Sequence, residues 1–300
     1  MKRTLILLAL VSGHVYGQQY VDLARVYYST SAKNNFEDSD SSTRVKEFGV
    51  DLTAPVVLND RRVLLTGLFY EQTQTKLFAS DPEQRMNVMG VRVGAVLTHS
   101  EKWSGTYLII PKISSDFEDI GSDDFQIGAI ALLKYAKHSR LSYKIGAYYN
   151  SEFFGPMFVP LLGLYYQSAN KKFESNLTLP FQLDASYQLQ KRLHVGMNFN
   201  GQVRSFRLSE IQETGKEGYV VKSSNELFTY LRFNLTEGLF LQVKGGYALG
   251  RHYRVFEKDD KIAWGSILIR VGDDRTQLNT DFSDGFVYQA MLVYRFHNNK

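Results

Sequence analysis

Residues 173–189, FESNLTLPFQLDASYQL, alternate apolar and polar side chains almost without interruption. Successive side chains of a β-strand point to opposite faces, so this segment has one apolar and one polar face. The same alternation recurs in residues 193–204 and 239–249, and no segment carries a sustained helical period. The chain is therefore predicted to be all-β.

Fourteen strands are expected along the chain, or twelve if Pro180 does not mark a turn. Short polar links alternate with longer ones at 31–43, 75–85, 113–123, 207–221 and 255–284. This layout is typical of a transmembrane antiparallel up-and-down β-barrel. The expected strands are 20–30, 44–55, 62–74, 86–98, 103–112, 124–137, 140–151, 159–168, 172–179, 181–189, 192–206, 222–234, 238–254 and 285–296.

The strand lengths favour a membrane barrel over a secreted β-propeller or sandwich. A spanning strand needs about 9–11 residues, and most of the expected segments reach that length. In lipid, a sheet satisfies all its backbone hydrogen bonds only when it closes on itself. We therefore expect one barrel domain, covering residues 18–300.

The first 17 residues have the parts of a secretory signal peptide. Lys2 and Arg3 are followed by an apolar run at residues 5–11, and Val15 and Gly17 suit a cleavage site after Gly17. The run is too short for a membrane anchor, which needs about 20 apolar residues. Export to the outer membrane with cleavage of residues 1–17 is expected.

Composition narrows the possible partners and cofactors. The formal charge of +4 falls to +2 without Lys2 and Arg3, and no basic block suggests a nucleic-acid partner. The chain has no cysteine, and its six histidines are scattered without ligand spacing, so no metal or other cofactor is expected. The acidic segment at 116–124 departs from calcium-loop spacing, which favours a solvated loop.

The polar faces of the strands carry many charges, together with Glu47 and Asp51. A charge on the lipid side is costly at the middle of the bilayer, so these side chains should line the interior. They are either a self-neutralising polar core or the lining of a water channel that favours anions. The candidate lumen-lining residues are Arg92, Lys134, Lys144, Asp184, Arg204, Glu226, Arg232, Lys244 and Arg295.

The last strand ends in aromatic residues, and Asn298, Asn299 and Lys300 extend past the final one. An alternating, aromatic C-terminal strand resembles the signal that the outer-membrane barrel-assembly machinery recognises. That machinery and outer-membrane lipid are the expected partners. The residues that carry this resemblance most clearly are Phe286, Tyr288, Tyr294 and Phe296.

Three further stretches carry a likeness to a known family: YLIIPKISSD at 107–116, GPMFVPLLG at 155–163, and Leu179-Pro180 followed by Tyr187. With them the chain resembles a family of Gram-negative outer-membrane β-barrel proteins of unknown function. The resemblance implies a barrel and brings no catalytic residues.

Two kinds of non-enzymatic barrel are expected first: a channel or transporter for small solutes, or a structural barrel without flux. One alternative is a lipid-modifying barrel enzyme that uses Ser205 and His252 near the rim. The other is a surface adhesin or binding barrel that uses the 255–284 loop. The sequence does not identify a substrate.

Overall fold

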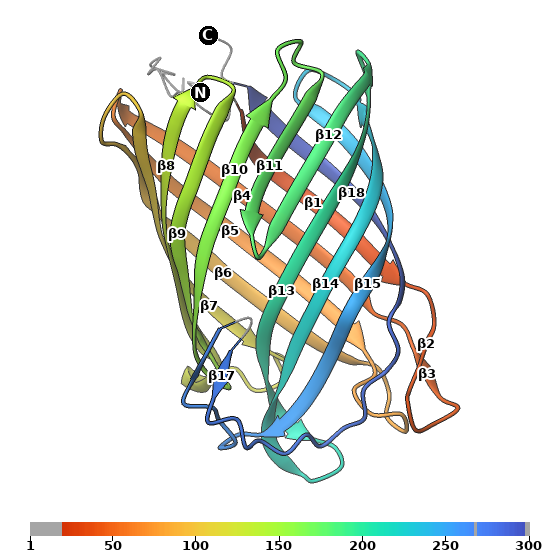
Figure 1. Ribbon diagram of the computed structural model, residues 1–300. Helices are drawn as coiled ribbons and strands as arrows, with labels where there is room; N and C mark the ends of the chain where they lie inside the picture. The colour runs from red at the N-terminus through yellow and green to blue at the C-terminus, as the bar shows by residue number, and fades with distance from the viewer. Residues whose placement is uncertain (1–19, 267–268, 298–300) are drawn as a thin grey trace, which may run out of the picture.

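The computed structural model describes residues 20–266 and 269–297, so the expected signal peptide at 1–17 lies outside the described residues. Fourteen long antiparallel strands form one closed barrel, which confirms the predicted fold class and the larger strand number (Figure 1). Within the described ranges, no helix is long and apolar enough to cross a membrane.

Each long strand corresponds to one expected range, but the long link expected at 207–221 is wrong, because β13 and β14 extend through most of it and leave only residues 212–215 between them. They are β1 (Tyr20–Ser31), β4 (Lys46–Asn59), β5 (Arg62–Thr75), β6 (Gln84–Thr98), β7 (Trp103–Ser115), β8 (Phe125–His138), β9 (Leu141–Glu152), β10 (Gly155–Gln167), β11 (Phe173–Leu179), β12 (Gln182–Gln190), β13 (Leu193–Ile211), β14 (Lys216–Asn234), β15 (Leu239–Glu257) and β18 (Gly285–His297). The loops hold the short strands β2 (Asn34–Asn35), β3 (Ser42–Thr43), β16 (Trp264–Gly265) and β17 (Arg270–Val271), and one 3-10 turn, η1 (Ser122–Asp124).

The barrel closes where β18 pairs with β1, with Tyr20 opposite His297. Every other long strand pairs with its neighbours in the chain, including β10 with β11 across Leu162 and Leu179. Six short links lie at the end of the barrel where β1 begins and β18 ends: β4–β5, β6–β7, β8–β9, β10–β11, β12–β13 and β14–β15. We call this end the turn end and the opposite end, which carries the long loops, the loop end (Figure 1).

The outer wall is apolar. Outward side chains such as Leu68, Ile109, Ile145 and Leu162 are more than half exposed, because they project from the convex face of the sheet. Exposed aromatic residues gather near the turn end, in the manner of an interfacial girdle: Trp103, Tyr143, Tyr166, Tyr187, Phe233 and Tyr294. A closed sheet with such a wall is suited to lipid, where every backbone group must be paired.

Three consecutive strands, β13, β14 and β15, are 19 residues long and continue past the others at the loop end. There they bend into the barrel, and Arg207 of β13 bridges to Ser115 of β7. By contrast, β11 and β12 have only 7 and 9 residues, and their hairpin turns part of the way down the wall (Figure 1).

A bulge at Gly250 reverses the faces of β15. Asn225 pairs with Leu249 and Ser223 pairs with His252, so β15 gains one residue at this point. Gly250 has a φ of +59°, a conformation that glycine adopts without strain. Strict alternation would place His252 on the same inner face as Lys244, but the extra residue turns His252 to the opposite face.

Candidate functional site

The inward faces of the strands enclose a cavity of about 610 Å³, which we call the lumen cavity. Six cationic side chains and six carboxylates line it, so its charged residues balance in number. Its cationic residues are Arg25, Lys144, Arg204, Arg232, Lys244 and Arg295, and its acidic residues are Asp22, Glu47, Asp51, Glu71, Asp184 and Glu226.

Lys222 of β14 is one of the most deeply buried charged residues of this interior, with a side chain that is 2% exposed. Its Nζ lies 2.5 Å from a carboxylate oxygen of Glu47 and 3.4 Å from one of Glu71. Glu71 is also paired with Arg204 at 2.9 Å and accepts a hydrogen bond of 2.7 Å from the hydroxyl of Tyr27. A buried charge is tolerated only when it is paired in this way.

Three further ion pairs hold the wall nearer the closing seam. Asp51 is paired with Arg25 at 2.9 Å and also with Arg92. At the turn end, Arg295 lies 2.5 Å from Asp22 and places its guanidinium 3.5 Å from the ring centre of Tyr20. Opposite charges therefore neutralise one another along this side of the lumen.

On the other side the cations meet amides and rings as well as carboxylates. Lys144 donates to the side-chain carbonyl of Asn176 at 2.5 Å, and Lys244 donates to that of Asn198 at 3.1 Å. Arg232 is 3.7 Å from Asp184. The two lysines are bonded to amides instead of carboxylates, and Nε of Arg232 is buried without a hydrogen-bond partner among the described residues, so this side presents surplus donors to the cavity.

The structure brings seven of the nine candidate residues to the lumen cavity; the exceptions are Arg92 and Lys134. Arg92 lines a neighbouring cavity of about 190 Å³ that shares Tyr27, Asp51 and Glu71 with the lumen cavity. Lys134, on β8, lies opposite Lys144 of β9 and is not among the residues that line the lumen cavity.

Sequence reasoning missed Arg25, Glu71 and Lys222. Glu71 shares its face of β5 with Phe69 and Thr73, and Lys222 shares its face of β14 with Glu226, so strand parity could have found both. What concealed Lys222 is its apolar neighbourhood, because Val220 and Val221 precede it.

At the turn end the lumen cavity adjoins a second cavity of about 190 Å³, the turn-end cavity. The two share four lining residues: Tyr20, Arg232, Phe240 and Arg295. The turn-end cavity is also lined by Lys171, Lys172, Thr236 and Glu237 from the short turns, so the interior extends to this end of the barrel.

At the loop end the interior is filled by two apolar clusters, together the loop-end core. One face of the bent strands contributes Phe206, Leu208 and Val220, which pack on Met86 and Val88 of β6. The other face contributes Tyr219, Val221 and Phe256, which pack on Met157, Val159 and Leu161 of β10. The ends of β13–β15 thus lie between two opposite walls and close this end.

The Ser/His pair suggested for an enzyme does not form. The Ser205 hydroxyl donates to Glu152 at 2.6 Å and is fully buried, whereas His252 contacts Asp281 at 3.0 Å. Within residues 20–266 and 269–297, no group of three or more His, Asp or Glu side chains could hold a metal ion.

The acidic segment at 116–124 is tied to the neighbouring strands. Asp116 accepts hydrogen bonds from the backbone and hydroxyl of Ser209, and Asp124 pairs with Arg207 at 3.2 Å. These carboxylates therefore anchor the loop onto the end of β13.

Comparison with known proteins places these features in context. The family model described as a domain of unknown function (DUF6268) matches residues 18–267. A search of curated proteins found none similar in sequence. Among solved structures, the COG4313 outer membrane channel from Pseudomonas putida F1 is similar at 10% identity and a TM-score of 0.48, over 95% of this chain and 100% of that one.

Two other solved structures are similar at lower scores. The toluene transporter TodX of Pseudomonas putida has 12% identity and a TM-score of 0.38, over 93% of this chain and 90% of that one. The NanC porin has 9% identity and a TM-score of 0.37, over 90% of this chain and 98% of that one.

Proposed function

The chain belongs to the DUF6268 family, whose function is unknown, and we propose that it is an outer-membrane channel for small solutes. The observation that carries this proposal is the lumen cavity, which shares four lining residues with the turn-end cavity. Together they give a polar interior that reaches one end of the barrel.

In this proposal the seven candidate residues that line the lumen cavity shape the passage. Because the charges that line the lumen cavity balance, the field inside favours neither ion sign strongly. Small polar or uncharged solutes are then the best-matched class. Lys144 and Lys244, which bond to amides, are positioned to donate hydrogen bonds to such solutes.

We also propose how the barrel reaches its membrane. Residues 1–17 direct export and are removed. The aromatic outer face of β18 is then recognised by the barrel-assembly machinery, through Phe286, Tyr288, Tyr294 and Phe296. The turn end faces the periplasm and the loop end faces outward, as is usual for bacterial barrels with short periplasmic turns.

Swelling of liposomes that contain the purified barrel tests the channel. Influx of small sugars should be faster than in protein-free liposomes. Asn200→Trp, which fills the lumen cavity, should slow influx, whereas Thr229→Trp on the exposed outer face of β14 should leave it unchanged. Swelling equal to that of protein-free liposomes would overturn the proposal.

The second candidate function, a structural barrel without flux, is favoured by the loop-end core. An apolar filling of Phe206, Leu208 and Val220 blocks a straight path along the barrel axis. If no solute of any size enters the liposomes, this second function is the one that remains.

A further inference from the structure

The wall of the barrel is incomplete on one side. The hairpin of β11 and β12 turns at Pro180 and Phe181, so β10 and β13 continue toward the loop end without a strand between them (Figure 1). Among residues 20–266 and 269–297, the strand pairing that borders β10 in this stretch is a single parallel bridge from Met157 to Gly265 of β16. A wedge in the sheet therefore opens below the hairpin.

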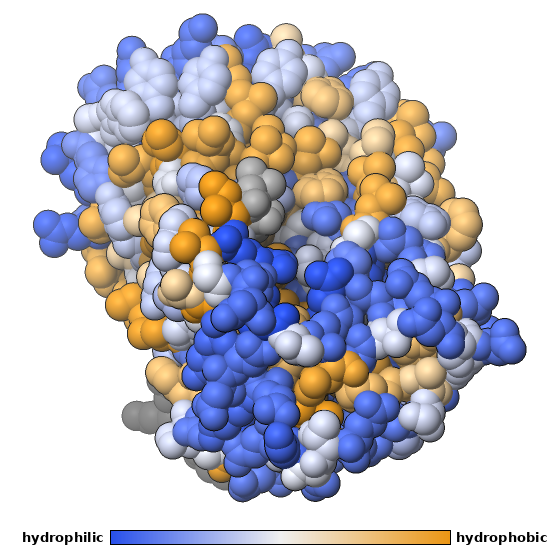
Figure 2. Space-filling model, turned by 60° about the horizontal axis from the view of Figure 1, so that its bottom comes forward, coloured by the Kyte–Doolittle hydropathy of each residue, from blue (hydrophilic) through white to orange (hydrophobic). Residues whose placement is uncertain are grey.

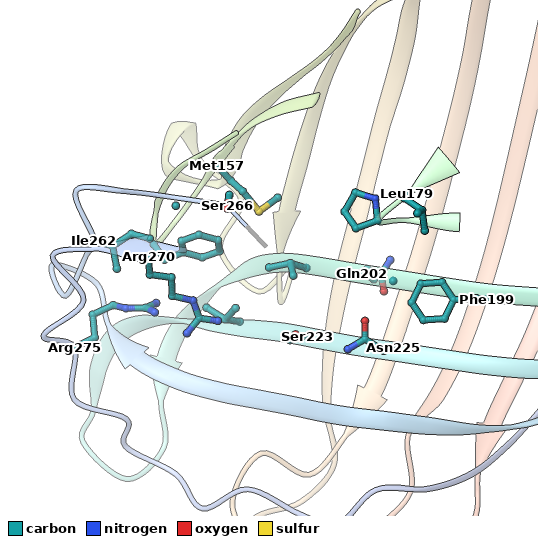
Figure 3. Close-up of a pocket in the computed structure, with 16 residues that line it drawn as sticks. Met157, Leu179, Phe199, Gln202, Ser223, Asn225, Ile262, Ser266, Arg270 and Arg275 are labelled. Atoms are coloured by element: carbon teal, nitrogen blue, oxygen red, sulfur yellow. The ribbon is translucent and has the colours of Figure 1, made fainter. Parts of the chain in front are cut away.

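This wedge holds a cavity of about 400 Å³, which we call the wall cavity (Figure 3). Its floor is the outward face of β13 and β14, with Phe199, Val203, Val221 and Ser223. Because these strands bend inward, their outer face sinks below the surface of the wall. The volume falls in the range of small-molecule sites, about 300–1,000 Å³.

The two ends of the wall cavity differ in chemistry. Leu179 and Phe199 lie at one end, with Gln202 and Asn225 as its polar lining residues, and Arg270 and Arg275 reach in from the loop at the other (Figure 3). Leu179 is 46% exposed on the lipid-facing wall, so the apolar end is continuous with the membrane-facing surface. Viewed from the loop end, the surface is hollowed near the border between the apolar wall and the hydrophilic loops (Figure 2).

The loop end of the wall cavity carries one unneutralised positive charge. Asp273 accepts two hydrogen bonds from Arg275, at 2.7 and 3.0 Å, and lies 3.5 Å from Arg270. These hydrogen bonds hold the pKa of Asp273 below its ordinary value, so its carboxylate stays ionised at neutral pH. Two guanidinium groups share one carboxylate, and Arg270 is 41% exposed.

Arg275 is held rigidly in this position. Its side chain is 3% exposed, and its guanidinium carbon lies 4.4 Å from the ring centre of Phe256. A fixed guanidinium loses little freedom when it binds an anion, which favours recognition of a carboxylate. Arg270 supplies the accessible charge. Arg275, whose Nε and Nη2 donate to Asp273 and whose Nη1 donates to the Tyr219 hydroxyl at 3.4 Å, supplies a fixed positive group beside it.

The wall cavity also meets the interior of the barrel. Gly201 and Gln202 line both the wall cavity and the lumen cavity, just beyond the tip of the β11–β12 hairpin. The backbone N–H of Gly201 donates to the carbonyl of Phe181 at 2.7 Å, which ties the hairpin tip to β13 at this junction.

We propose that the wall cavity binds a single-chain amphiphile with a carboxylate head, such as a long-chain fatty acid. Its apolar chain lies along Leu179, Phe199 and Val203, and its carboxylate meets Arg270 and Arg275. The site lies outside the lumen, so binding there does not require that the barrel conduct solutes.

Tryptophan fluorescence offers a direct test, because the chain has only two tryptophans. Trp264 directly precedes Gly265 of the wall cavity, whereas Trp103 begins β7 at the turn end. In nanodiscs of zwitterionic lipid, a brominated fatty acid should quench Trp264 saturably in the Trp103→Phe protein. Trp103 in the Trp264→Phe protein should show only the linear quenching of membrane partitioning.

Two substitutions in the Trp103→Phe background separate the two ends of the site. Ser223→Phe fills the cavity and should remove the saturable phase, whereas Thr229→Phe on the same face of β14 should keep it. Arg270→Gln should weaken binding of the acid about tenfold, the loss expected for one charge-assisted hydrogen bond. A brominated alcohol of equal chain length, which has no carboxylate, should bind equally to the protein with Arg270 and to the Arg270→Gln variant.

Absence of saturable quenching, or retention of it in Ser223→Phe, would overturn the site. Equal affinity for the acid before and after Arg270→Gln would overturn the carboxylate assignment. A barrel that binds the acid but admits no sugar would overturn the proposed channel and leave this site in place. A barrel that admits sugar but binds no acid would overturn this site and leave the proposed channel in place.

Discussion

The two halves of the barrel interior differ in polarity and in packing. Toward the turn end, inward side chains are polar and surround the lumen cavity, with ion pairs such as Arg295–Asp22 across neighbouring strands. Toward the loop end, the interior is a packed apolar core in which Leu208 and Val220 are almost fully buried. The same strands thus line a polar cavity in one half of the barrel and form a packed apolar core in the other.

The difference shows in which part of a strand the alternation of polar and apolar residues predicts the environment of each side chain. In the turn half each strand has one face in lipid and one in the lumen, so polar and apolar residues alternate. In the loop half the ends of β13–β15 are covered on both faces, and Tyr219, Val220 and Val221 are buried in succession. Strands buried on both faces carry continuous apolar runs.

The largest effect is expected at the boundary between the halves. Lys222→Met leaves the Glu47 carboxylate buried without its partner, and removal of one member of a buried pair costs about 3–5 kcal/mol. The free energy of unfolding, measured by denaturant titration in lipid vesicles, should fall by that amount. The double variant Lys222→Met/Glu47→Gln should recover most of it. An unchanged stability of the single variant would mean that water reaches this pair.

The next test compares a core leucine with a lipid-facing one. Leu208→Ala empties space in the loop-end core and should reduce stability by about 3 kcal/mol. Leu189→Ala lies on the outer wall, where the side chain is 52% exposed, and should cost about 1 kcal/mol or less. Similar losses for the two variants in the same denaturant titration would show that the loop end is not packed as a core.

Water access separates the halves directly, because the chain has no natural cysteine. Asn200→Cys lines the lumen cavity, and Val220→Cys is fully buried in the loop-end core. A small charged thiol reagent should modify the first about a hundredfold faster, since the second must wait for local opening. Comparable rates, followed by mass spectrometry, would remove the distinction between the halves.

The smallest effect is expected outside both halves, at the loop surface. Lys258 pairs with Asp123 at 2.8 Å and with Glu217 at 2.6 Å, and all three groups are largely exposed. The pairing raises the pKa of Lys258 and lowers that of Asp123. The contribution of Asp123 to folding stability is therefore present above the ordinary pKa of an aspartate. It is lost as the pH falls through the lowered pKa of Asp123 in the folded protein. Because exposed pairs contribute little, Lys258→Gln should leave the melting temperature unchanged at pH 7 and pH 3. A clear shift at pH 7 alone would show that this pair stabilises the loop.

The sequence could predict the strand number, the strand order and most inward positions. A strand that has lipid on one face and water on the other must alternate apolar and polar residues, so the alternation identifies both the strand and its faces. The turn at Leu179-Pro180 and the strand at 285–296 were both recognisable in this way. The bending of β13–β15 was not, since an apolar run such as 219–221 does not say which surface covers it. Nor was the position of His252, because one extra residue at Gly250 exchanges the two faces.

The short hairpin of β11 and β12 also has a consequence for the surrounding lipid. Seven residues at about 3.4 Å each span about 24 Å along the strand, and less along the membrane normal because barrel strands are tilted. The wall beside this hairpin is therefore lower than the wall formed by β4 and β5, which have 14 residues each. The bilayer must thin on this side to avoid hydrophobic mismatch, so the protein sits in an annulus of uneven thickness. Such a lipid ring gives the barrel a preferred side for meeting thinner membrane.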